Sequence, residues 1–329
     1  MNCGSARINA NGNGAVTDIN RLMKATGPAL GLSMLLVGCA ARILASSPTP
    51  VPAQAPKPAA DILIFASHPD DETFCCATVI QRASAEGKRT HVVFFTNGDG
   101  FAKAASDLTG NPPDSLTARD FFELARTRQT EALSAIAALG LQPNDATFLG
   151  YPDGALDSVY ETVGGMPFQQ RFTERSETYG IAVPDFHSRA HGTPASYERG
   201  SVLADIVELL RIFEPAEIYF PNDADTHRDH RAAFRFVRDA LTAVGYEGRS
   251  FTYVLHAKGY PCPAELPCPP PMRASPSMEQ AAVKFKALLC YDSQIWEFFK
   301  SEQLVRVIAG LDEVFWLAEP DTSSSPSWK

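Results

Sequence analysis

The segment Asp61-Ile-Leu-Ile-Phe-Ala-Ser-His-Pro-Asp-Asp-Glu72 is the strongest indication of the fold class. Its first half, Asp61 to Ser67, is an apolar run bounded by polar residues, which is typical of a strand buried on both faces of a parallel sheet. Its second half places an imidazole and three carboxylates within five residues, His68 to Glu72. In open α/β folds, ligands bind at the carboxyl ends of the strands. This loop is therefore the first candidate for a functional site.

Helices and strands alternate along the rest of the chain. Further strands are predicted at 90–96, 146–149, 217–220 and 250–256, and helices at 73–86, 118–139, 202–213, 228–243 and within 278–310. This alternation predicts an α/β protein with a Rossmann-like three-layer α/β/α fold, a mostly parallel sheet and its site at the carboxyl ends of the strands. The polar, irregular segment 166–196 is long enough to indicate a functional insertion or a substrate loop.

Charge and composition exclude one class of partner. The chain has 329 residues with 29 Lys and Arg against 38 Asp and Glu, a net charge of −9. A phosphate backbone requires a positive surface, so no nucleic-acid partner is expected.

The N-terminal region predicts export. The apolar run Ala29–Gly38 has the length of a signal-peptide core and is too short to span a bilayer. It leads into Leu36-Val-Gly-Cys-Ala40, which resembles the bacterial lipobox; the alternative is an apolar core helix that contains a cysteine. We expect a signal peptide over 1–39, with translation starting at Met1 or Met23. The protein would then be an exported, membrane-anchored bacterial lipoprotein on the periplasmic or cell-surface side, held only by a lipid on Cys39.

A Pro/Ala-rich segment over 40–60 is predicted to be an extended linker to the folded domain. The domain is expected over 61–319, followed by a disordered tail at 320–329. Cys262 and Cys268 lie in a Pro-rich stretch, and the sequence leaves open whether they form a disulfide. The remaining cysteines of the domain, Cys75, Cys76 and Cys290, are predicted to be buried thiols. The alternative for Cys75 is a role as an additional soft metal ligand.

Two clusters of potential metal ligands follow predicted strands. In the first, repulsion among the carboxylates of residues 70–72 is costly unless a cation sits between them. The second, Asn222 to His230, supplies two imidazoles, His227 and His230, three residues apart at the start of a helix, so both reach the same side of its first turn. Mixed His and Asp ligation with an open position suits catalytic zinc.

The same residues resemble a known family. The chain from about Asp61 to Trp316 resembles the PIG-L or LmbE-like de-N-acetylases, whose hallmarks are an Ala-His-Pro-Asp-Asp-Glu box and a later His-Pro-Asp-His box. Here the boxes stand as Ser-His-Pro-Asp-Asp-Glu over 67–72 and His-Arg-Asp-His over 227–230. Further correspondences are Thr-Asn-Gly-Asp at 96–99, Arg128 with Glu131, Tyr-Pro-Asp-Gly at 151–154 and Tyr-Asp-Ser-Gln at 291–294. Two departures are Cys75-Cys76, where the family often has Gly-Gly, and Arg228, where it commonly has Pro.

The resemblance implies roles for five residues. His68, Asp71 and His230 would hold one zinc ion per chain, and Asp70 would be the general base. His227 would protonate or polarise the reacting centre. The implied activity is removal of an acetyl or other acyl group from the amide nitrogen of an amino sugar or an N-acetylglucosaminyl conjugate, with an N-acetylated sugar as the partner.

Substrate contacts are also expected. The candidates are Arg128, Asp99 and Asp153, which lie in the motifs just quoted, together with His256. A pair between Arg128 and Glu131 on one helix face is the alternative for Arg128, and a packed position at a strand end is the alternative for His256. His91 is predicted to be structural, and His187 and His191 to be loop residues.

Two other functions fit the same residues. The zinc chemistry would also serve a metal-dependent esterase or a non-sugar amidase. A lipid-anchored sugar-binding protein without catalysis would keep the pocket but would not require Asp70 beside the ligands.

Overall fold

The structure, a computed structural model, describes residues 60–162, 166–258, 263, 265–267 and 269–318. The predicted signal peptide with Cys39, nearly all of the predicted linker, the C-terminal tail, and Cys262 and Cys268 lie outside the described residues.

Seven strands form one sheet in the order β3-β2-β1-β4-β5-β7-β6. The first five are parallel, and β7 pairs antiparallel with both β5 and β6. The strand bounds are β1 Ile62–Ala66, β2 Thr90–Thr96, β3 Ala146–Tyr151, β4 Glu217–Pro221, β5 Arg249–Tyr253, β6 Met272–Ala274 and β7 Glu313–Leu317. The predicted mostly parallel α/β sheet is confirmed.

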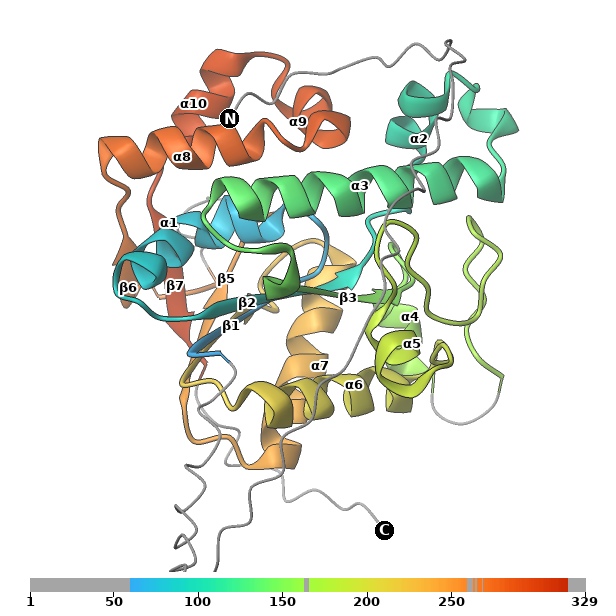
Figure 1. The fold of residues 1–329 in the computed structure, drawn as a ribbon, viewed down its shortest axis with the longest axis horizontal. Coiled ribbons are helices and arrows are strands. Elements are labelled where there is room, and N and C mark those ends of the chain that lie inside the picture. Colours follow the sequence, from blue (N-terminus) through green and yellow to red (C-terminus); the bar gives the residue numbers. More distant parts are fainter. Residues whose placement is uncertain (1–59, 163–165, 259–262, 264, 268, 319–329) are drawn as a thin grey trace, which may run out of the picture. The chain divides into compact units, whose positions relative to one another are not determined.

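Helices cover both faces of the sheet (Figure 1). On one face lie α1, α3 and α8, with α9 and α10 beyond α8, and on the other face lie α6 and α7. The helix bounds are α1 Asp71–Ala85, α2 Ala102–Thr109, α3 Ala118–Ala138, α4 Leu156–Glu161, α5 Phe186–His191, α6 Arg199–Phe213, α7 Arg228–Val244, α8 Met278–Leu288, α9 Asp292–Phe299 and α10 Glu302–Ala309, with single 3-10 turns at Pro113–Ser115 and Pro143–Asp145.

Both faces of strand β1 are buried, which explains the unbroken apolar run in its sequence. Its side chains alternate between two buried clusters: Ile62 and Ile64 pack on the α1 and α3 side, and Leu63 and Phe65 pack on the α6 and α7 side. Because both faces are covered, a polar residue at any of these positions would be buried without water.

The structure departs from the sequence prediction mainly in short elements. Strand β5 ends at Tyr253, so His256 lies in the loop beyond it and not at the end of the strand. Helices α2, α4 and α5 and the antiparallel strands β6 and β7 were not predicted, since each is three to eight residues long and carries little periodicity. The insertion 166–196 is irregular as predicted, apart from α5.

The cysteine prediction is confirmed for Cys75 and Cys76, which are buried thiols, whereas Cys290 is half-buried. Within the described part of the chain, no helix is both long and apolar enough to cross a bilayer.

Candidate metal and catalytic site

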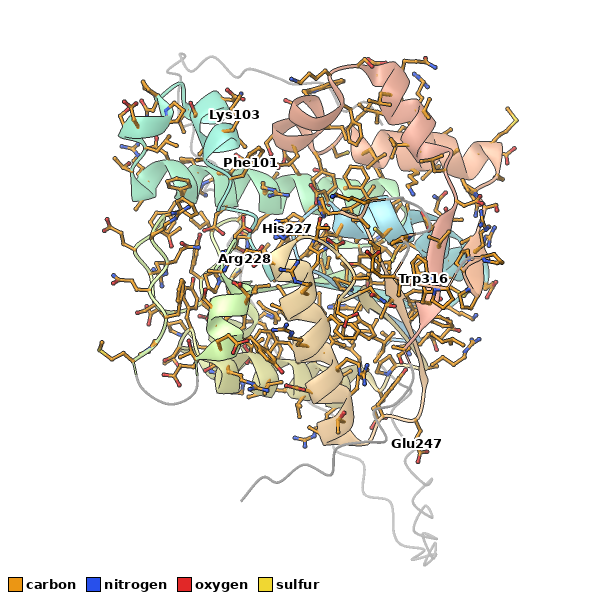
Figure 2. The ribbon with its side chains drawn as sticks, turned by 180° about the vertical axis from the view of Figure 1, so that it is seen from behind. Phe101, Lys103, His227, Arg228, Glu247 and Trp316 are labelled. Carbon is orange, nitrogen blue, oxygen red and sulfur yellow. The ribbon has the colours of Figure 1, made fainter. Side chains whose placement is uncertain are left out.

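The two predicted ligand clusters meet at the carboxyl end of the sheet. The loop after β1 carries the first cluster, and the segment between β4 and α7 carries the second. His227 and Arg228 lie at the N-terminal end of α7 (Figure 2). Since β1 and β4 are neighbours in the parallel sheet, their following loops share one edge.

Three side chains converge within this edge. The Nδ1 atom of His68 lies 3.3 Å from the Nε2 atom of His230. The Oδ2 atom of Asp71 lies 3.3 Å from that Nε2 atom and 3.7 Å from His68 Nδ1. Ligands of a tetrahedral zinc ion with bonds of about 2.0–2.1 Å stand about 3.3 Å apart. The other carboxylate oxygen of Asp71 is buried and has no hydrogen-bond partner among the described residues. These donors therefore fit a zinc ion.

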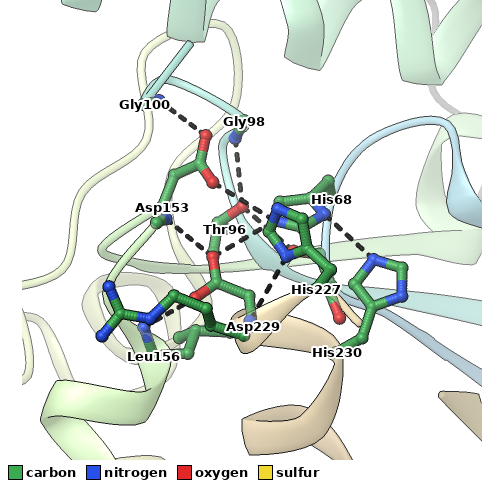
Figure 3. Close-up of polar contacts among 12 residues, drawn as sticks. His68, Thr96, Gly98, Gly100, Asp153, Leu156, His227, Asp229 and His230 are labelled. Atoms are coloured by element: carbon green, nitrogen blue, oxygen red, sulfur yellow. Dashed lines mark hydrogen bonds and ion pairs between the residues drawn. The ribbon is translucent and has the colours of Figure 1, made fainter. Parts of the chain in front are cut away.

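Carboxylates hold the opposite nitrogen of each ring. The Nε2 atom of His68 lies 3.2 Å from both Asp153 Oδ1 and Asp229 Oδ2 (Figure 3). The Nδ1 atom of His230 lies 3.0 Å from Asp225 Oδ2. A carboxylate accepts a hydrogen bond from the N–H group that it faces, so the proton of the neutral ring stays on that nitrogen and the other nitrogen is free for a metal. Both rings thus present the correct nitrogen to the shared space.

The electrostatics of the site favour a positive charge at its centre. Burial lowers the pKa of His230, but the carboxylates of Asp71 and Asp225 outweigh it and raise the pKa to about 9. Burial disfavours the charged form of Asp71 as well, yet His230 and His68 hold its pKa well below the ordinary value. A bound cation would replace the protons on the inward-facing nitrogens of His68 and His230, because metal binding and protonation compete for the same nitrogens.

Asp70 stands beside these ligands with its carboxylate held differently. Its Oδ2 atom lies 3.2 Å from a guanidinium nitrogen of Arg128. Burial raises the pKa of Asp70 to about 7, against the lowering effect of Arg128. A carboxyl group with a pKa near neutrality accepts and returns a proton readily, which suits a general base.

His227 caps α7 with its own side chain. The Nδ1 atom of its ring accepts a hydrogen bond from the backbone N–H of Asp229 at 3.3 Å. Burial, together with the neighbouring imidazoles of His68 and His230, lowers the pKa of His227 to about 3. The ring is therefore neutral with its proton on Nε2. Of the two roles that the sequence left open, polarisation of the reacting centre fits this state better than protonation.

Two of the four predicted substrate-binding residues contact other residues of the candidate site, Asp70 and His68. Arg128 is buried against Asp70 and donates to the carbonyl oxygen of Gly98 at 2.9 Å, and Asp153 contacts His68. The alternative pairing of Arg128 with Glu131 is not formed, since Glu131 accepts hydrogen bonds from Ser293.

The other two lie around the same centre. Asp99 is buried and accepts a hydrogen bond from the Tyr179 hydroxyl at 2.9 Å. His256 is partly exposed, with its ring centre 5.3 Å from that of His227 and 4.9 Å from that of His230. His256 thus reaches the site from the loop after β5.

Three residues near the centre received no role from the sequence. Asp225 and Asp229 lie inside the second cluster. Their position beside His227 and His230 is the available signal, because imidazole ligands of a metal are usually oriented by carboxylates. Tyr291, whose hydroxyl donates to Glu72 at 2.6 Å, comes from a segment 219 residues away, so no local pattern indicates that contact. Cys75 packs in the apolar cluster, and none of the candidate metal groups among the described residues contains a cysteine.

The sequence matches a known family and proteins related to it. Residues 63–241 match the family model of PIG-L, described as GlcNAc-PI de-N-acetylase. A 1D-myo-inositol 2-acetamido-2-deoxy-alpha-D-glucopyranoside deacetylase from Saccharopolyspora erythraea is 29% identical over 256 residues, which cover 71% of this chain and 77% of that protein.

Solved structures share the fold. The N,N'-diacetylchitobiose deacetylase from Pyrococcus horikoshii superposes with a TM-score of 0.50 at 19% identity, covering 79% of this chain and 84% of that one. The zinc-inhibited form of the teicoplanin deacetylase Orf2 superposes with a TM-score of 0.51 at 16% identity, covering 80% and 99%. The family match spans more than half of the sequence and includes both predicted ligand clusters, and the chain belongs to the PIG-L family of de-N-acetylases.

Proposed function

We propose that this protein is a zinc-dependent hydrolase that removes an acetyl group from the amide nitrogen of an amino sugar or an N-acetylglucosaminyl conjugate. The observation that carries the proposal is the convergence of His68 Nδ1, His230 Nε2 and Asp71 Oδ2 beside the carboxylate of Asp70. The deacetylase activity of the S. erythraea relative on an acetamido sugar supports the substrate class.

His68, Asp71 and His230 would hold the ion. When bound, zinc supplies a Lewis acid that polarises water and the substrate carbonyl. Asp153, Asp229 and Asp225 keep the two imidazole rings oriented toward it.

Asp70 and His227 would carry the proton chemistry. Asp70 takes a proton from water as the water oxygen adds to the amide carbon. The Nε2–H group of His227 donates a hydrogen bond to the carbonyl oxygen as negative charge develops there. Asp70 then returns its proton to the nitrogen as the C–N bond breaks, which releases acetate and the free amine.

An amine-release assay tests the proposal. The domain from residue 60 onward, loaded with zinc, is incubated with N-acetylglucosamine, its inositol conjugate, N,N'-diacetylchitobiose and an acetyl ester. Chelated protein and Asp70→Asn are the controls. We expect amine release from at least one sugar, loss with chelation, and a fall of about 10²-fold or more in Asp70→Asn with zinc retained. Faster hydrolysis of the ester than of every sugar would instead indicate an esterase, and no hydrolysis of any compound would favour a binding protein.

A further inference from the structure

Asp70 has an unusual backbone. Its φ is 127° and its ψ is −29°, whereas the other non-glycine residues with positive φ in the described chain, Glu174, Glu214 and Lys300, have φ between 45° and 59°. Those three lie near the left-handed helical region that L-residues tolerate, and Asp70 lies well outside it. A residue in such a region persists only where the surrounding structure over-determines its conformation.

Two buried polar side chains hold the peptide group that precedes Asp70. The carbonyl oxygen of Pro69 accepts a hydrogen bond from the guanidinium group of Arg128. The N–H of the same peptide group, which belongs to Asp70, donates to Glu72 Oε2 at 3.1 Å. Arg128 and Glu72 are both buried, so these hydrogen bonds act without competition from water. Rotating this peptide group would break both bonds, and they therefore set the φ angle of Asp70.

Glu72 is itself held from the far end of the chain. Its second oxygen, Oε1, accepts a hydrogen bond of 2.6 Å from the hydroxyl of Tyr291 and another from the hydroxyl of Thr73. Glu72 and Tyr291 are both fully buried, and the Tyr291 ring packs in the apolar cluster between the sheet and α1. The tyrosine therefore presents its hydroxyl from a rigid position. Among the described residues outside the 68–73 segment, Tyr291 is the only one that donates a hydrogen bond to this carboxylate.

We propose that Tyr291 is a positioning residue for the reaction: by holding Glu72, it fixes the peptide group between Pro69 and Asp70 and thereby aims the Asp70 carboxylate. This inference rests on the proposed function, in which Asp70 is the base. It assigns to the Tyr-Asp-Ser-Gln segment a task distinct from metal binding, since Tyr291 reaches Glu72 and not His68, Asp71 or His230.

Tyr291→Phe tests the inference because it removes one hydroxyl and keeps the ring. Tyr219→Phe is the matched control: its hydroxyl also donates to a glutamate, Glu217, at 3.0 Å, and its ring is buried in the same apolar cluster. In zinc-loaded protein we expect Tyr291→Phe to lower kcat by about tenfold, the effect of losing one strong buried hydrogen bond. We also expect this variant to keep one zinc per chain and a KM within twofold of the wild-type value. The Tyr219→Phe variant should keep the wild-type kcat.

Amide hydrogen exchange in zinc-free protein gives a readout that does not depend on any substrate. The peptide containing Asp70, followed by mass spectrometry, should exchange faster in Tyr291→Phe and at the wild-type rate in Tyr219→Phe. Should Tyr291→Phe not fold, Thr73→Val removes the other hydroxyl from Glu72 Oε1 and should change exchange and kcat in the same direction. If folded Tyr291→Phe exchanges the Asp70 peptide at the wild-type rate, the inference is overturned, even where no sugar is hydrolysed. Loss of zinc in this variant also overturns it, because the hydroxyl would then act on the metal ligands.

Discussion

The Nδ1 atom of His68 and the Nε2 atom of His230 face each other at 3.3 Å, although 162 residues separate them in the chain. Each ring has its other nitrogen occupied by a carboxylate, so two acceptor nitrogens point at one space. A proton or a metal ion between the two nitrogens would stabilise that arrangement, and the nearby Asp71 carboxylate would complete a set of three metal ligands.

The first prediction concerns metal content. His68→Ala, Asp71→Ala and His230→Ala should each lose most of the zinc, because each removes one of three protein ligands. The measurement is zinc per chain by mass spectrometry after dialysis, with His191→Ala, a partly exposed histidine paired with Glu208, as the control. Full occupancy in all three variants would reject this ligand set.

The second prediction concerns the carboxylate behind His230. Asp225 accepts from His230 and also from the backbone N–H groups of His227, Leu255 and His256. An amide at this position cannot accept all four bonds, so Asp225→Asn should weaken zinc affinity by about 10–100-fold. Competition with a chelator measures the affinity, and Asp239→Asn, which lies within α7 and is paired with Arg199, is the control. Wild-type affinity in Asp225→Asn would contradict the orienting role.

The third prediction separates the two roles of His227. A neutral ring that donates from Nε2 stabilises the developing oxyanion, which forms in both amide and ester hydrolysis. We therefore expect His227→Ala to lower the turnover of an N-acetyl sugar and of an acetyl ester by similar factors, on the order of 10²–10³. An amide loss more than about ten times the ester loss would identify His227 as the acid that protonates the leaving nitrogen.

The fourth prediction concerns acid stability. His91 is buried, lies 2.9 Å from the Thr147 hydroxyl and packs on Phe213, and burial lowers its pKa to about 3. The unfolded chain protonates this residue near pH 6.5. Between pH 6.5 and pH 3 the unfolded chain therefore binds a proton that the folded protein does not bind. The free energy of unfolding is unaffected by His91 above pH 6.5 and falls progressively as the pH drops toward 3. Between pH 7 and pH 5, the wild type should lose about 2 kcal/mol more unfolding free energy than His91→Gln. Urea unfolding at both pH values measures this, and equal losses would contradict the pKa shift.

The fifth prediction concerns export. If Cys39 carries a lipid, Cys39→Ser should release the protein from membranes of the producing bacterium and leave the turnover of the purified domain unchanged. Cell fractionation measures the first effect. Continued membrane association of Cys39→Ser would reject the lipid anchor.

The sequence alone predicts the parallel part of the sheet, which the structure confirms, and predicts a site at the carboxyl ends of its strands. Strands such as Ile62–Ala66 must be apolar throughout because both faces are covered, and this pattern is local enough to read. The two ligand clusters were also visible, since each occupies one loop, and their family resemblance indicated the chemistry. The short antiparallel strands β6 and β7 were missed because three to five residues carry no distinctive period.

The contacts that hold the candidate ligands follow from the tertiary structure alone. Which nitrogen of His68 faces the shared space depends on Asp153 and Asp229, which come from the loop after β3 and from α7. The backbone of Asp70 depends on Arg128, on Glu72 and, through Glu72, on Tyr291. Such contacts join residues that are distant in the chain, and they exist because the fold brings the ends of separate strands and helices to one edge of the sheet. No periodicity or local motif encodes which of these side chains will meet.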